Sequence, residues 1–585
     1  MKKIYCSIGL LAFIGMKAQV FEEVTPSPFK NSYYSSIAVG DYNNDGYKDV
    51  FFAGALDTDN DNDVDTTINE LYKNNNGVFE LAQVIEDYPV HLSSVKFIDF
   101  DNDGLLDIID TGLSYKNVVD YRHYRFKNNG SSFELVDNLP GKIYGNIDVF
   151  DFNHDGKMDY SLNGVRYVQG VGFTKYVDLY TNSKSGFTKE ENWILGSQNG
   201  KMKAFDFNND NELDAVVTGV DNKNNFSFFI YKNNGKKMEL HSEQKGLISG
   251  DVTFADFNAD GFLDIVVSGK DSNHDSHLIV LWNDGNGNFT ESEIPNEGLE
   301  MASIDVGDLN NDGYYDFIII GNAKDANSRY VPNINVFIYD PKGNNFSKFD
   351  DTDIYHLGSN GSIELVDYNN DNHLDIIATG FDWKLPDTPL FSKLFKNKET
   401  KPNEKPNPPK NLSATVKDDR VVFEWSGASD DKTPEKALRY EISVGSESGK
   451  SDIAKYQVTT PSWYLKKENL PNTIYWSIKS IDASKVLSVS SKEQVAYDLS
   501  VDDRDIKHKA LYPNPVKDIL NISTDAKVKS YKLTNMLGQT VKEGSLSGKE
   551  IDLSVLESGI YIIDIQLQNE RISIRKLLKI NFIKL

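Results

Sequence analysis

Aspartate and asparagine recur at a fixed spacing in a nine-residue segment that this sequence contains seven times. The segment reads DYNNDGYKD from Asp41, DFDNDGLLD from Asp99 and DFNADGFLD from Asp256. In every copy, side chains that carry oxygen stand at positions one, three, five and nine. Calcium takes six to eight oxygen ligands at about 2.3–2.6 Å, and short Asp and Asn side chains on a curled loop can supply them. The spacing therefore predicts a calcium-binding loop in each copy.

The remaining positions fit the same interpretation. Position six requires a sharp backbone turn with positive φ, and it is Gly in five copies and Asn, the next most tolerant residue, at Asn211 and Asn372. Position seven is expected to contribute its backbone carbonyl, as in related calcium loops. The predicted ligands of the seven loops are, in chain order, Asp41, Asn43, Asp45, Tyr47, Asp49; Asp99, Asp101, Asp103, Leu105, Asp107; Asp151, Asn153, Asp155, Lys157, Asp159; Asp206, Asn208, Asp210, Glu212, Asp214; Asp256, Asn258, Asp260, Phe262, Asp264; Asp308, Asn310, Asp312, Tyr314, Asp316; and Asp367, Asn369, Asp371, His373, Asp375.

An eighth match, DTDNDNDVD, places Asp57, Asp59, Asp61 and Asp65 in the same register. The prediction is thus about seven calcium ions, with an eighth at this segment unless it is only a solvated acidic loop. One alternative for the whole set is Asx-rich turns without metal, which leaves the Asp at position nine of all seven copies unexplained. An EF-hand is the other alternative, but its loop runs twelve residues to a Glu between helices. Here the flanking residues alternate like strands.

The elements around the loops indicate an all-β fold. The loops start 50 to 59 residues apart, and the second unit contains four strand signals, SVKFID, DIIDTG, HYRFKNN and SSFELV. Tandem four-stranded units of this length are typical of β-propeller blades. The last unit lacks its fourth strand, and QVFEEV at residues 19–24 matches that strand in phase. We therefore predict a seven-bladed β-propeller over residues 19–399, closed by its N-terminal strand so that no edge stays exposed.

The loops and strands resemble the FG-GAP or VCBS repeats of integrin α-type propellers and their bacterial relatives over residues 19–399. The resemblance implies that the calcium hairpins join first and second strands on one face, and that ligands bind on the opposite face. The eighth acidic match lies in a second-to-third strand connection, hence on the expected ligand face. Aromatic side chains that could reach this face, and could stack on sugars or anchor a protein partner, are Tyr115, Tyr121, Trp193, Tyr330 and Trp383.

The net charge and the cysteine content argue against several classes of partner and of fold. The chain has 88 acidic and 62 basic residues, for a formal net charge of −26. This excess argues against nucleic acid, which requires a basic footprint, and against attraction to anionic lipid. Clustered carboxylates repel one another, so the folded chain is expected to need cations. Cys6 is the only cysteine, which excludes a disulfide framework.

The segments around the repeats indicate an exported protein with two further β domains. Residues 1–18 read as a signal peptide whose apolar core is too short to span a membrane, and no other segment is a transmembrane candidate. Residues 400–410, TKPNEKPNPPK, read as an extended Pro-rich linker. Residues 411–498 resemble a fibronectin type III sandwich, with Trp425 in the core and Tyr475 in a tyrosine-corner-like position. Such modules are usually spacers.

A linker at 499–510 leads to residues 511–585, which resemble the type A C-terminal sorting domain of the Bacteroidetes type IX secretion system. The matching residues are Tyr512-Pro513-Asn514-Pro515, Gly538 and Gly559-Ile560-Tyr561. The resemblance implies that the type IX machinery is a partner, and that the domain carries the protein across the outer membrane and is cleaved there. The expected location is secreted or on the outer-membrane surface.

The sequence contains no HExxH pair, GxSxG elbow, phosphate loop or dinucleotide fingerprint. His154 and His373 stand at non-ligand side-chain positions of two loops and are expected to be solvent-exposed. We therefore predict a calcium-binding protein, not an enzyme, that recognises an extracellular glycan or protein. One alternative is a polysaccharide lyase or hydrolase on the same scaffold, in which His91, His123 or His356 could act. Another is an architectural surface protein without a ligand.

Overall fold

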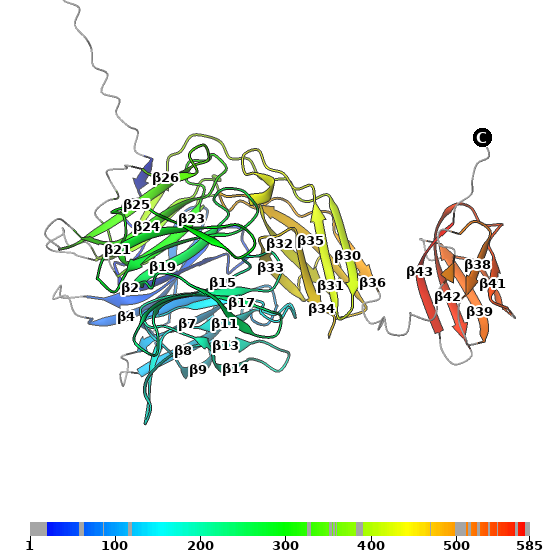
Figure 1. Cartoon of the computed structure of the whole chain (residues 1–585), viewed down its shortest axis with the longest axis horizontal. Helices are drawn as coiled ribbons and strands as arrows, with labels where there is room; N and C mark the ends of the chain where they lie inside the picture. Colours follow the sequence, from blue (N-terminus) through cyan, green and yellow to red (C-terminus); the bar gives the residue numbers. More distant parts are fainter. Residues whose placement is uncertain are drawn as a thin grey trace, which may run out of the picture. The chain divides into compact units, whose positions relative to one another are not determined.

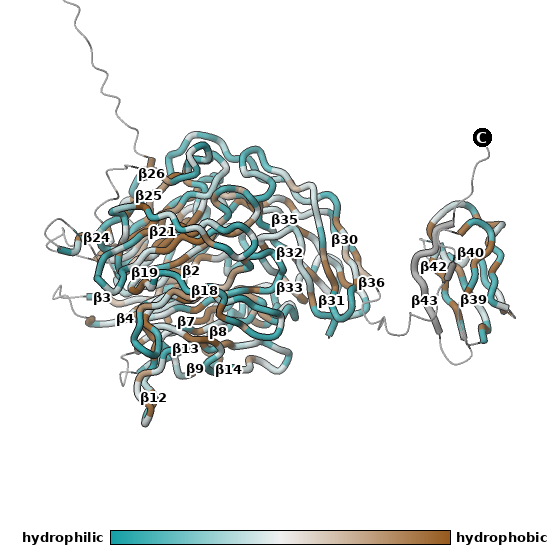
Figure 2. Tube along the Cα trace, viewed as in Figure 1, coloured by the Kyte–Doolittle hydropathy of each residue, from teal (hydrophilic) through white to brown (hydrophobic). Residues whose placement is uncertain are grey.

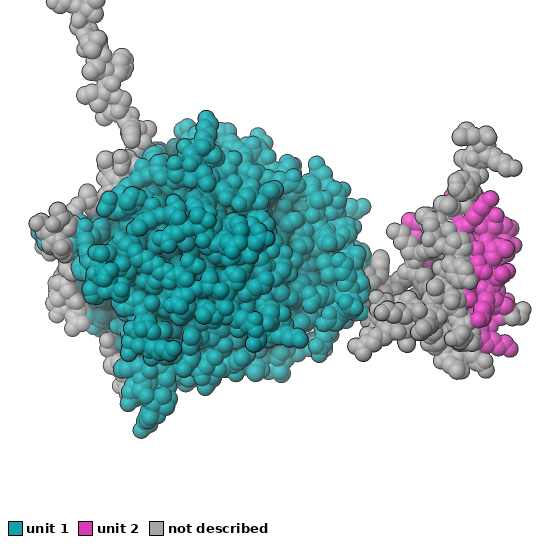
Figure 3. Space-filling view, in the orientation of Figure 1, with its two compact units in different colours: residues 1–499 teal, residues 500–585 magenta. Residues whose placement is uncertain are grey.

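The fold is described by a computed structural model that covers residues 20–57, 64–85, 87–114, 120–324, 329–349, 354, 357–358, 360–381, 390–468, 470–497, 511–512, 516–522, 527–535, 539–546, 548–567 and 571–579. Chain contacts divide it into two compact units, residues 1–499 and 500–585, which are described separately (Figure 3). The described elements are strands apart from one 3-10 turn, η1 (Glu435–Ala437). The all-β prediction is therefore confirmed. No helix within these ranges is long and apolar enough to cross a membrane.

The described residues between 21 and 397 form seven antiparallel sheets in chain order (Figure 1). The first two sheets comprise β2 (Tyr33–Gly40), β3 (Asp49–Leu56), β4 (Thr66–Asn74) and β5 (Phe79–Val84); and β6 (His91–Ile98), β7 (Asp107–Ser114), β8 (Asp120–Asn128) and β9 (Phe133–Pro140). The third comprises β10 (Ile147–Phe150), β11 (Asp159–Leu162), β12 (Val165–Val168), β13 (Gly172–Thr181) and β14 (Thr188–Leu195).

The later sheets repeat the pattern. The fourth and fifth comprise β15 (Met202–Phe205), β16 (Asp214–Val220), β17 (Phe226–Asn233) and β18 (Met238–Glu243); and β19 (Ile248–Ala255), β20 (Asp264–Lys270), β21 (Ser276–Asn283) and β22 (Phe289–Glu293). The sixth comprises β23 (Glu300–Gly307), β24 (Asp316–Lys324), β25 (Tyr330–Asp340) and β26 (Asn345–Phe349). The seventh comprises β27 (Ile363–Val366), β28 (Asp375–Phe381), β29 (Leu390–Asn397) and β1 (Phe21–Glu23).

The N-terminal strand completes the last sheet, as the similarity of its sequence pattern to the fourth strands predicted. β1 pairs antiparallel with β29, so that Phe21 lies opposite Asn397. Phe21 is buried among side chains of the sixth and seventh sheets. Pairing between the two ends of the repeat array covers an edge strand that would otherwise be open to association.

The third sheet departs from the predicted four-strand unit. Its second-to-third strand connection folds into an additional strand, β12, which pairs with the start of β13. Gly170 lies in the turn of this hairpin and Gly172 begins β13, and both have positive φ. Figure 2 shows the hairpin projecting from the propeller with apolar residues near its tip.

The propeller core lies between neighbouring sheets. One layer joins Phe205 and Val216 of the fourth sheet to Val252, Ile265 and Ile279 of the fifth, and all five are buried. Burying one such side chain contributes about 1.5–3 kcal/mol. The sheets are consequently fixed against one another, and the loops at their ends are held in place by a rigid ring.

Residues 411–497 form a sandwich, called the sandwich domain below, within the same compact unit as the propeller. Its core contains Trp425, as predicted, together with Trp463 and Trp476. Tyr475, expected at a tyrosine corner, is only half-buried, and its neighbour Trp476 is the aromatic residue of that strand that fills the core. One sheet contains β30 (Asn411–Lys417), β31 (Arg420–Ser426) and β34 (Ser462–Lys466); the other contains β33 (Ala454–Val458), β32 (Arg439–Gly445), β35 (Thr473–Ile481) and β36 (Gln494–Tyr497).

The second unit is a smaller pair of sheets with a core that includes Leu520, Leu533 and Ile563. Gly559, Ile560 and Tyr561 of the predicted sorting signature begin its strand β42, whereas Pro513, Asn514, Pro515 and Gly538 lie outside the described residues. The strands are β37 (Leu511–Tyr512), β38 (Ile519–Ile522) and β41 (Glu550–Asp552), and β40 (Thr540–Ser545), β39 (Val528–Asn535), β42 (Gly559–Leu567) and β43 (Arg571–Lys579).

Candidate calcium loops and the open face

All seven nine-residue segments connect the first and second strands of a sheet, and the ninth residue opens the second strand. Neighbouring loops lie side by side: the Asn44 side chain donates to the Gly104 carbonyl at 2.8 Å, and the Asn370 side chain to the Gly46 carbonyl at 3.1 Å. We call this end of the propeller the loop face. We call the opposite end, with the second-to-third strand turns and the starts of the first strands, the open face.

The first Asp of each loop accepts two backbone hydrogen bonds. In the first loop, Asp41 accepts from the N–H of Asp45 at 3.0 Å and from that of Gly46 at 2.9 Å, and the other six loops repeat both bonds. The position-six residue has positive φ in all seven loops, including Asn211 and Asn372, at 64° and 66°. The predicted turn is confirmed, and it curls each loop around its own carboxylates.

The ninth Asp has a structural role that the sequence did not reveal. Asp49 accepts hydrogen bonds from the N–H of Asn74 on the third strand, at 2.7 Å, and from that of Tyr42, at 3.2 Å. The equivalent Asp residues accept the same pair of bonds in the other loops. An Asp at position nine therefore does not by itself distinguish a calcium loop from a structural turn.

The loops nevertheless fit a hard cation. Carboxylate oxygens of Asp99, Asp101 and Asp107 lie within 4.8 Å of one another, and so do those of Asp367, Asp371 and Asp375. In the sixth loop, Oδ1 of Asn310, the predicted position-three ligand, is buried without a hydrogen-bond partner among the described residues. A set made of carboxylate, amide and carbonyl oxygens suits calcium rather than a softer metal.

Burial makes the ionised form of the loop carboxylates unfavourable unless a cation is bound. Burial, with a smaller contribution from nearby carboxylates, raises the pKa of Asp214 and of Asp264 to about 8. Four loops have a lysine beside them on the third strand; Lys73, for instance, pairs with Asp45 at 3.2 Å, and Lys127, Lys232 and Lys396 stand at the equivalent positions. The loops that start at Asp151, Asp256 and Asp308 have Thr181, Trp282 and Ile338 there instead. In these three loops, no third-strand lysine at this position offsets the negative charge of the carboxylates.

The sandwich domain packs against the loop face. Lys485 donates to Asp305 Oδ2 at 2.8 Å and to the Leu365 carbonyl at 3.2 Å, and the N–H of Asp308 donates to the Ala483 carbonyl at 2.8 Å. Among the described residues, side chains or backbone of six loops, all except that at 41–49, bond to residues 400–497. The spacer prediction is therefore wrong for this domain.

The predicted linker is also part of this contact. The Lys401 carbonyl accepts from the Asn311 side chain at 2.9 Å, and the Asn403 carbonyl accepts from the Asn372 side chain at 3.0 Å. Residues 400–410 thus run across two loops and do not act as a free spacer.

His154 shows most clearly how the contact changes a loop. It was expected to be solvent-exposed, but it is 3% exposed and its ring stacks on Tyr464 at a centroid distance of 3.9 Å. Burial lowers its pKa to about 3. Tyr464 also donates to Glu212 at 2.7 Å. His373 is likewise largely covered, with 14% of its side chain exposed and a ring nitrogen 3.1 Å from the Lys401 carbonyl.

The open face carries a ring of seven residues in left-handed conformations. Each lies seven positions before the first Asp of a loop and has φ between 47° and 55°: Tyr34, Leu92, Tyr144, Asn199, Ser249, Met301 and Asn360. Backbone bonds join three pairs of successive members: the N–H of Tyr34 donates to the Asn360 carbonyl at 2.6 Å, that of Asn199 to the Tyr144 carbonyl at 2.8 Å, and that of Ser249 to the Asn199 carbonyl at 2.6 Å. The left-handed region costs roughly 1–2 kcal/mol for residues other than Gly, and such strain is concentrated at functional sites. We call these residues the axial ring.

The predicted ligand-face aromatics fall into three groups. Tyr121 and Tyr330 lie at or near the starts of third strands on the open face, and Tyr330 is 50% exposed. Trp193 does not present a free ring there, because it packs on Phe150 and on Phe152 of the third loop, 4.9 Å away. Tyr115 and Trp383 lie outside the described residues, as do Asp59 and Asp61 of the eighth acidic match. Asp57 and Asp65, at the ends of that match, are described and belong to the open face.

Sequence reasoning missed several open-face residues. Burial and then the nearby Tyr144 raise the pKa of Tyr34 and of Tyr121. Tyr144 itself is 41% exposed. Tyr144 stands seven residues before the first Asp of its loop, as the other axial-ring residues do, and this spacing is the signal that could have identified it. Tyr167 and Phe173 of the β12–β13 hairpin, 55% and 65% exposed with centroids 5.5 Å apart, have no comparable signal.

The histidines considered for catalysis do not form a site. His123 is fully buried between sheets and bonds to Tyr160 at 2.8 Å, and burial lowers its pKa to about 3. His91 is also buried, and burial lowers its pKa to about 4. His356 lies outside the described residues.

Comparison with protein families gives two matches. The family described as FG-GAP-like repeat matches residues 41–109, 206–267 and 256–319. The family described as secretion system C-terminal sorting domain matches residues 510–580. A comparison with curated proteins finds no match.

Solved structures that match this chain include proteins of different activities. A six-bladed fucose-recognising lectin from Aleuria aurantia is 10% identical, with 56% of this chain and 97% of that chain covered and a TM-score of 0.33. Fructan 1-exohydrolase IIa from Cichorium intybus is 12% identical, with 74% and 89% covered and a TM-score of 0.26. PorZ, a surface component of the type IX secretion system of Porphyromonas gingivalis, is 11% identical, with 96% and 100% covered and a TM-score of 0.13. These likenesses do not separate a binding protein from an enzyme.

Proposed function

Because this chain is an FG-GAP-repeat propeller with a type IX secretion sorting domain, exported to the cell surface or the medium, we propose that it binds an extracellular glycan or protein. The ligand is received on the open face. Calcium belongs in the seven loops of the loop face, held by the Asp and Asn side chains and the position-seven carbonyls. When bound, it would stabilise the ionised form of the buried loop carboxylates.

One observation carries this proposal: the two faces of the propeller are not equally available. The loop face is largely covered by residues 400–497 of the same chain. The open face instead carries the axial ring and exposed aromatic side chains, including Tyr144 and Tyr330. Exposed aromatic rings are typical anchors for sugars and for protein partners. A rigid ring of sheets beneath them reduces the entropy that binding costs.

The loops also fix the positions of the residues on the open face. The same sheets begin at the axial ring and end at the loops, so an ordered loop fixes a first strand at one end and its ring residue at the other. Extracellular calcium modules bind at about 10⁻⁴–10⁻³ M, a range that suits an exported protein.

The experiment is native electrophoresis of the full exported chain, in calcium, through gels that contain entrapped polysaccharides. We expect retardation in at least one gel, loss of this retardation in Tyr144→Ala, and no loss in Val489→Ala. Val489 is 71% exposed in the sandwich domain and serves as the matched surface control. Retardation that survives Tyr144→Ala and Tyr330→Ala contradicts an open-face site. Clearing of the polysaccharide would favour the enzyme alternative, and free migration in every gel would favour a protein ligand.

A further inference from the structure

The first strands of the seven sheets surround the axis of the propeller. Strands β2, β6, β10, β15, β19, β23 and β27 each contact the first strand of the next sheet, and β27 contacts β2, so that they close a ring. Three residues before the first Asp of each loop, these strands carry Ala38, Lys96, Asp148, Lys203, Thr253, Asp305 and Glu364. Because these residues share one position in the repeat, their side chains leave the strands on the same face. We call them the girdle.

The girdle side chains extend toward the axis. Asp148 accepts a hydrogen bond from the N–H of Ala204 at 2.7 Å, so it reaches the free edge of the first strand of the next sheet. Burial raises the pKa of Glu364 to about 7, whereas Lys96 and Lys203 lower it. These lysines belong to the second and fourth sheets and Glu364 to the seventh. Charges on three separate sheets act on one another because their side chains share the space that the first strands enclose.

Side chains do not fill this space. All five charged girdle residues keep exposed surface, and 25% of the Lys203 side chain and 16% of the Asp305 side chain are exposed. Residues on the other face of the same strands, such as Ile147 and Met202, are 0% exposed. The girdle therefore lines a hollow along the axis, which we call the axial channel.

The sandwich domain closes the loop-face end of the channel. Lys485 donates to Asp305 Oδ2 at 2.8 Å and to the Leu365 carbonyl at 3.2 Å, so its ammonium group lies at the level of the girdle. The backbone of Lys485 is fixed in a turn, in which its N–H donates to the Asp482 carbonyl at 3.1 Å. A small ligand therefore enters the channel from the open-face end, through the axial ring.

Two girdle lysines have few acceptors of their own. Among the described residues, Lys96 forms no hydrogen bond or ion pair, and Lys203 forms one ion pair, with Asp251 at 3.7 Å. The girdle carboxylates differ, because backbone N–H groups donate to Asp148 and to Asp305, each at 2.7 Å. Ammonium groups with unused donors in a confined space favour an anionic acceptor.

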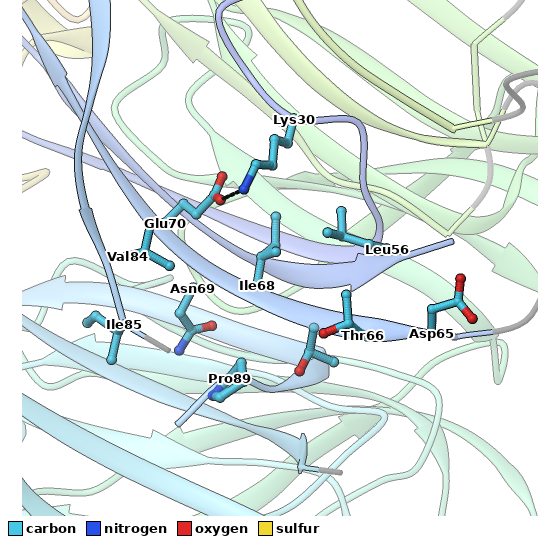
Figure 4. A pocket seen from close by; sticks show the side chains of 11 residues that line it. Lys30, Leu56, Asp65, Thr66, Ile68, Asn69, Glu70, Val84, Ile85 and Pro89 are labelled. Carbon is cyan, nitrogen blue, oxygen red and sulfur yellow. Dashed lines mark hydrogen bonds and ion pairs between the residues drawn. The ribbon is translucent and has the colours of Figure 1, made fainter. Parts of the chain in front are cut away.

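A pocket of about 430 Å³ beside the first sheet shows the opposite case (Figure 4). Its lysine, Lys30, forms an ion pair with Glu70. Glu70 is fully buried and also accepts a hydrogen bond from Tyr72 at 2.7 Å. The positive charge in this pocket is already neutralised by a fixed carboxylate, whereas Lys96 in the channel has no such partner among the described residues.

The charges around the channel favour a ligand with a single negative charge. Three lysines face three carboxylates at the level of the girdle: Lys96, Lys203 and Lys485, and Asp148, Asp305 and Glu364. Two residues closer to the open face, Lys201 and Asp251 balance each other. Because the pKa of Glu364 is about 7, this residue is about half protonated at neutral pH, which leaves a small positive excess. A monoanion neutralises this excess, whereas the second charge of a dianion is repelled.

Hydroxyl groups line the channel between the girdle and the axial ring. Ser36, Ser94, Ser303 and Ser362 stand two residues before girdle residues and share their strand face. The Oγ atoms of Ser36 and Ser94 accept the N–H groups of Val95, at 3.1 Å, and Ile147, at 3.0 Å. Each hydroxyl hydrogen is left to donate to a ligand oxygen. A ligand that reaches the lysines thus passes a wall suited to a hydroxylated chain.

We propose that the axial channel binds a sugar acid, a ligand with one carboxylate and a hydroxylated carbon chain. The ammonium groups of Lys96 and Lys203 donate to the carboxylate, and the serine hydroxyls contact the rest of the ligand. The acid is either free or the last unit of a longer glycan. This site goes beyond the proposed open-face recognition and does not depend on it, because its contacts lie deeper along the axis than the axial ring.

The test is titration calorimetry with saturation-transfer NMR on the full exported chain in calcium. The probes are glucuronate, galacturonate and gluconate, each compared with its neutral amide, and sulfate as a dianion. We expect at least one acid to bind at one site per chain, and its amide and sulfate to bind at least about tenfold more weakly. A disaccharide that ends in the bound acid separates the sources. Tighter binding of the disaccharide supports a glycan end, and tighter binding of the monosaccharide supports a free acid.

Substitutions in the girdle test the assignment of the contacts. Lys96→Met and Lys203→Met should each weaken binding of the acid about tenfold or more, because each removes a hydrogen bond to a charged group. Glu364→Gln should strengthen binding about threefold or more at pH 8, where Glu364 is mostly ionised and repels the ligand. A variant that only loosens the channel does not strengthen binding. Lys342→Met, at an exposed position in the turn between β25 and β26, is the matched control and should leave binding unchanged.

Four results would overturn the inference. They are failure of all three acids to bind, equal binding of an acid and its amide, binding that survives both lysine substitutions, and weaker binding by Glu364→Gln. If no acid binds but Tyr144→Ala abolishes polysaccharide retardation, the open-face proposal stands and the channel site falls.

Discussion

The two faces of the propeller use polar residues in different ways. On the loop face, acidic side chains bond to their own backbone, and six loops bond to the sandwich domain or the segment that precedes it. On the open face, seven residues adopt left-handed conformations, and Tyr34, Leu92, Tyr144 and Met301 among them are bulky. The acidic loop face is therefore largely internal scaffolding. The open face is the one that we propose for a partner.

Removal of calcium should produce the largest effect, because it acts on all seven loops at once. A ligand at ten times its Kd stabilises the native state by about 1.4 kcal/mol per site. Excess EDTA is therefore expected to lower the melting temperature of the full chain by about 10 °C or more relative to millimolar calcium. Scanning calorimetry measures this shift. Identical melting curves in both buffers would leave the loops as Asx-rich turns without metal.

Disruption of the loop-face contact should produce the next largest effect. Tyr464 is 5% exposed and stacks on His154, and Tyr464→Ala removes this ring together with its bond to Glu212. We expect a loss of about 3 kcal/mol in the free energy of unfolding, with faster hydrogen exchange at residues 151–159. Denaturant unfolding and exchange mass spectrometry measure the two quantities. Phe173→Ala, an exposed aromatic on the open face, is the control and should change neither. Unchanged exchange in Tyr464→Ala would show that the sandwich domain does not stabilise the loops.

The pH dependence of stability sharpens the comparison further. Burial raises the pKa of Asp214 and Asp264 from the ordinary 3.8 to about 8 in the folded chain. Their stabilising contribution is thus fully present below about pH 4 and is lost as the pH rises through 8. In EDTA, the melting temperature should fall between about pH 5 and pH 8. In calcium the fall should be smaller, since the cation favours the ionised carboxylates. Equal slopes in the two buffers would contradict cation binding at these residues.

A substitution in the axial ring should have the smallest effect on the free energy of unfolding. Met301 has a φ of 50° and is 46% exposed. Met301→Gly relieves backbone strain but increases the entropy of the unfolded chain, so we expect a change within about 1 kcal/mol. Met301→Val should destabilise more, because a β-branched side chain tolerates this conformation poorly. Chemical denaturation of both variants measures the difference. Equal destabilisation by Gly and Val would mean that the ring conformation is not strained.

Much of the propeller could be predicted from sequence, because its determinants are local. The spacing of Asp41, Asn43 and Asp45 defines one loop, the alternation around it defines two strands, and the period defines the array. Closure of the ring by β1, which contains Phe21, was predictable from the sequence. Residues 19–24 have the same alternation of apolar and polar residues as the fourth strand that the last unit lacks. The sorting domain was predictable from a signature that is itself local.

The rest depends on contacts between distant segments. Nothing near His154 indicates that Tyr464, more than 300 residues later, covers it. The hydrogen bond between Asp49 and the N–H of Asn74 is equally absent from a local pattern, which is why position nine was read as a metal ligand alone. Tertiary packing, not local spacing, creates these contacts.

Hydrogen exchange of the full chain with and without calcium tests the division between the two faces most directly. Calcium should slow exchange in the seven loops and in residues 400–497, which pack on six of them, while the exposed side of the axial ring changes less. A polysaccharide that binds should then slow exchange around Tyr144 and leave the loops unchanged. Calcium-independent exchange in every loop, or ligand protection confined to the loop face, would contradict the account.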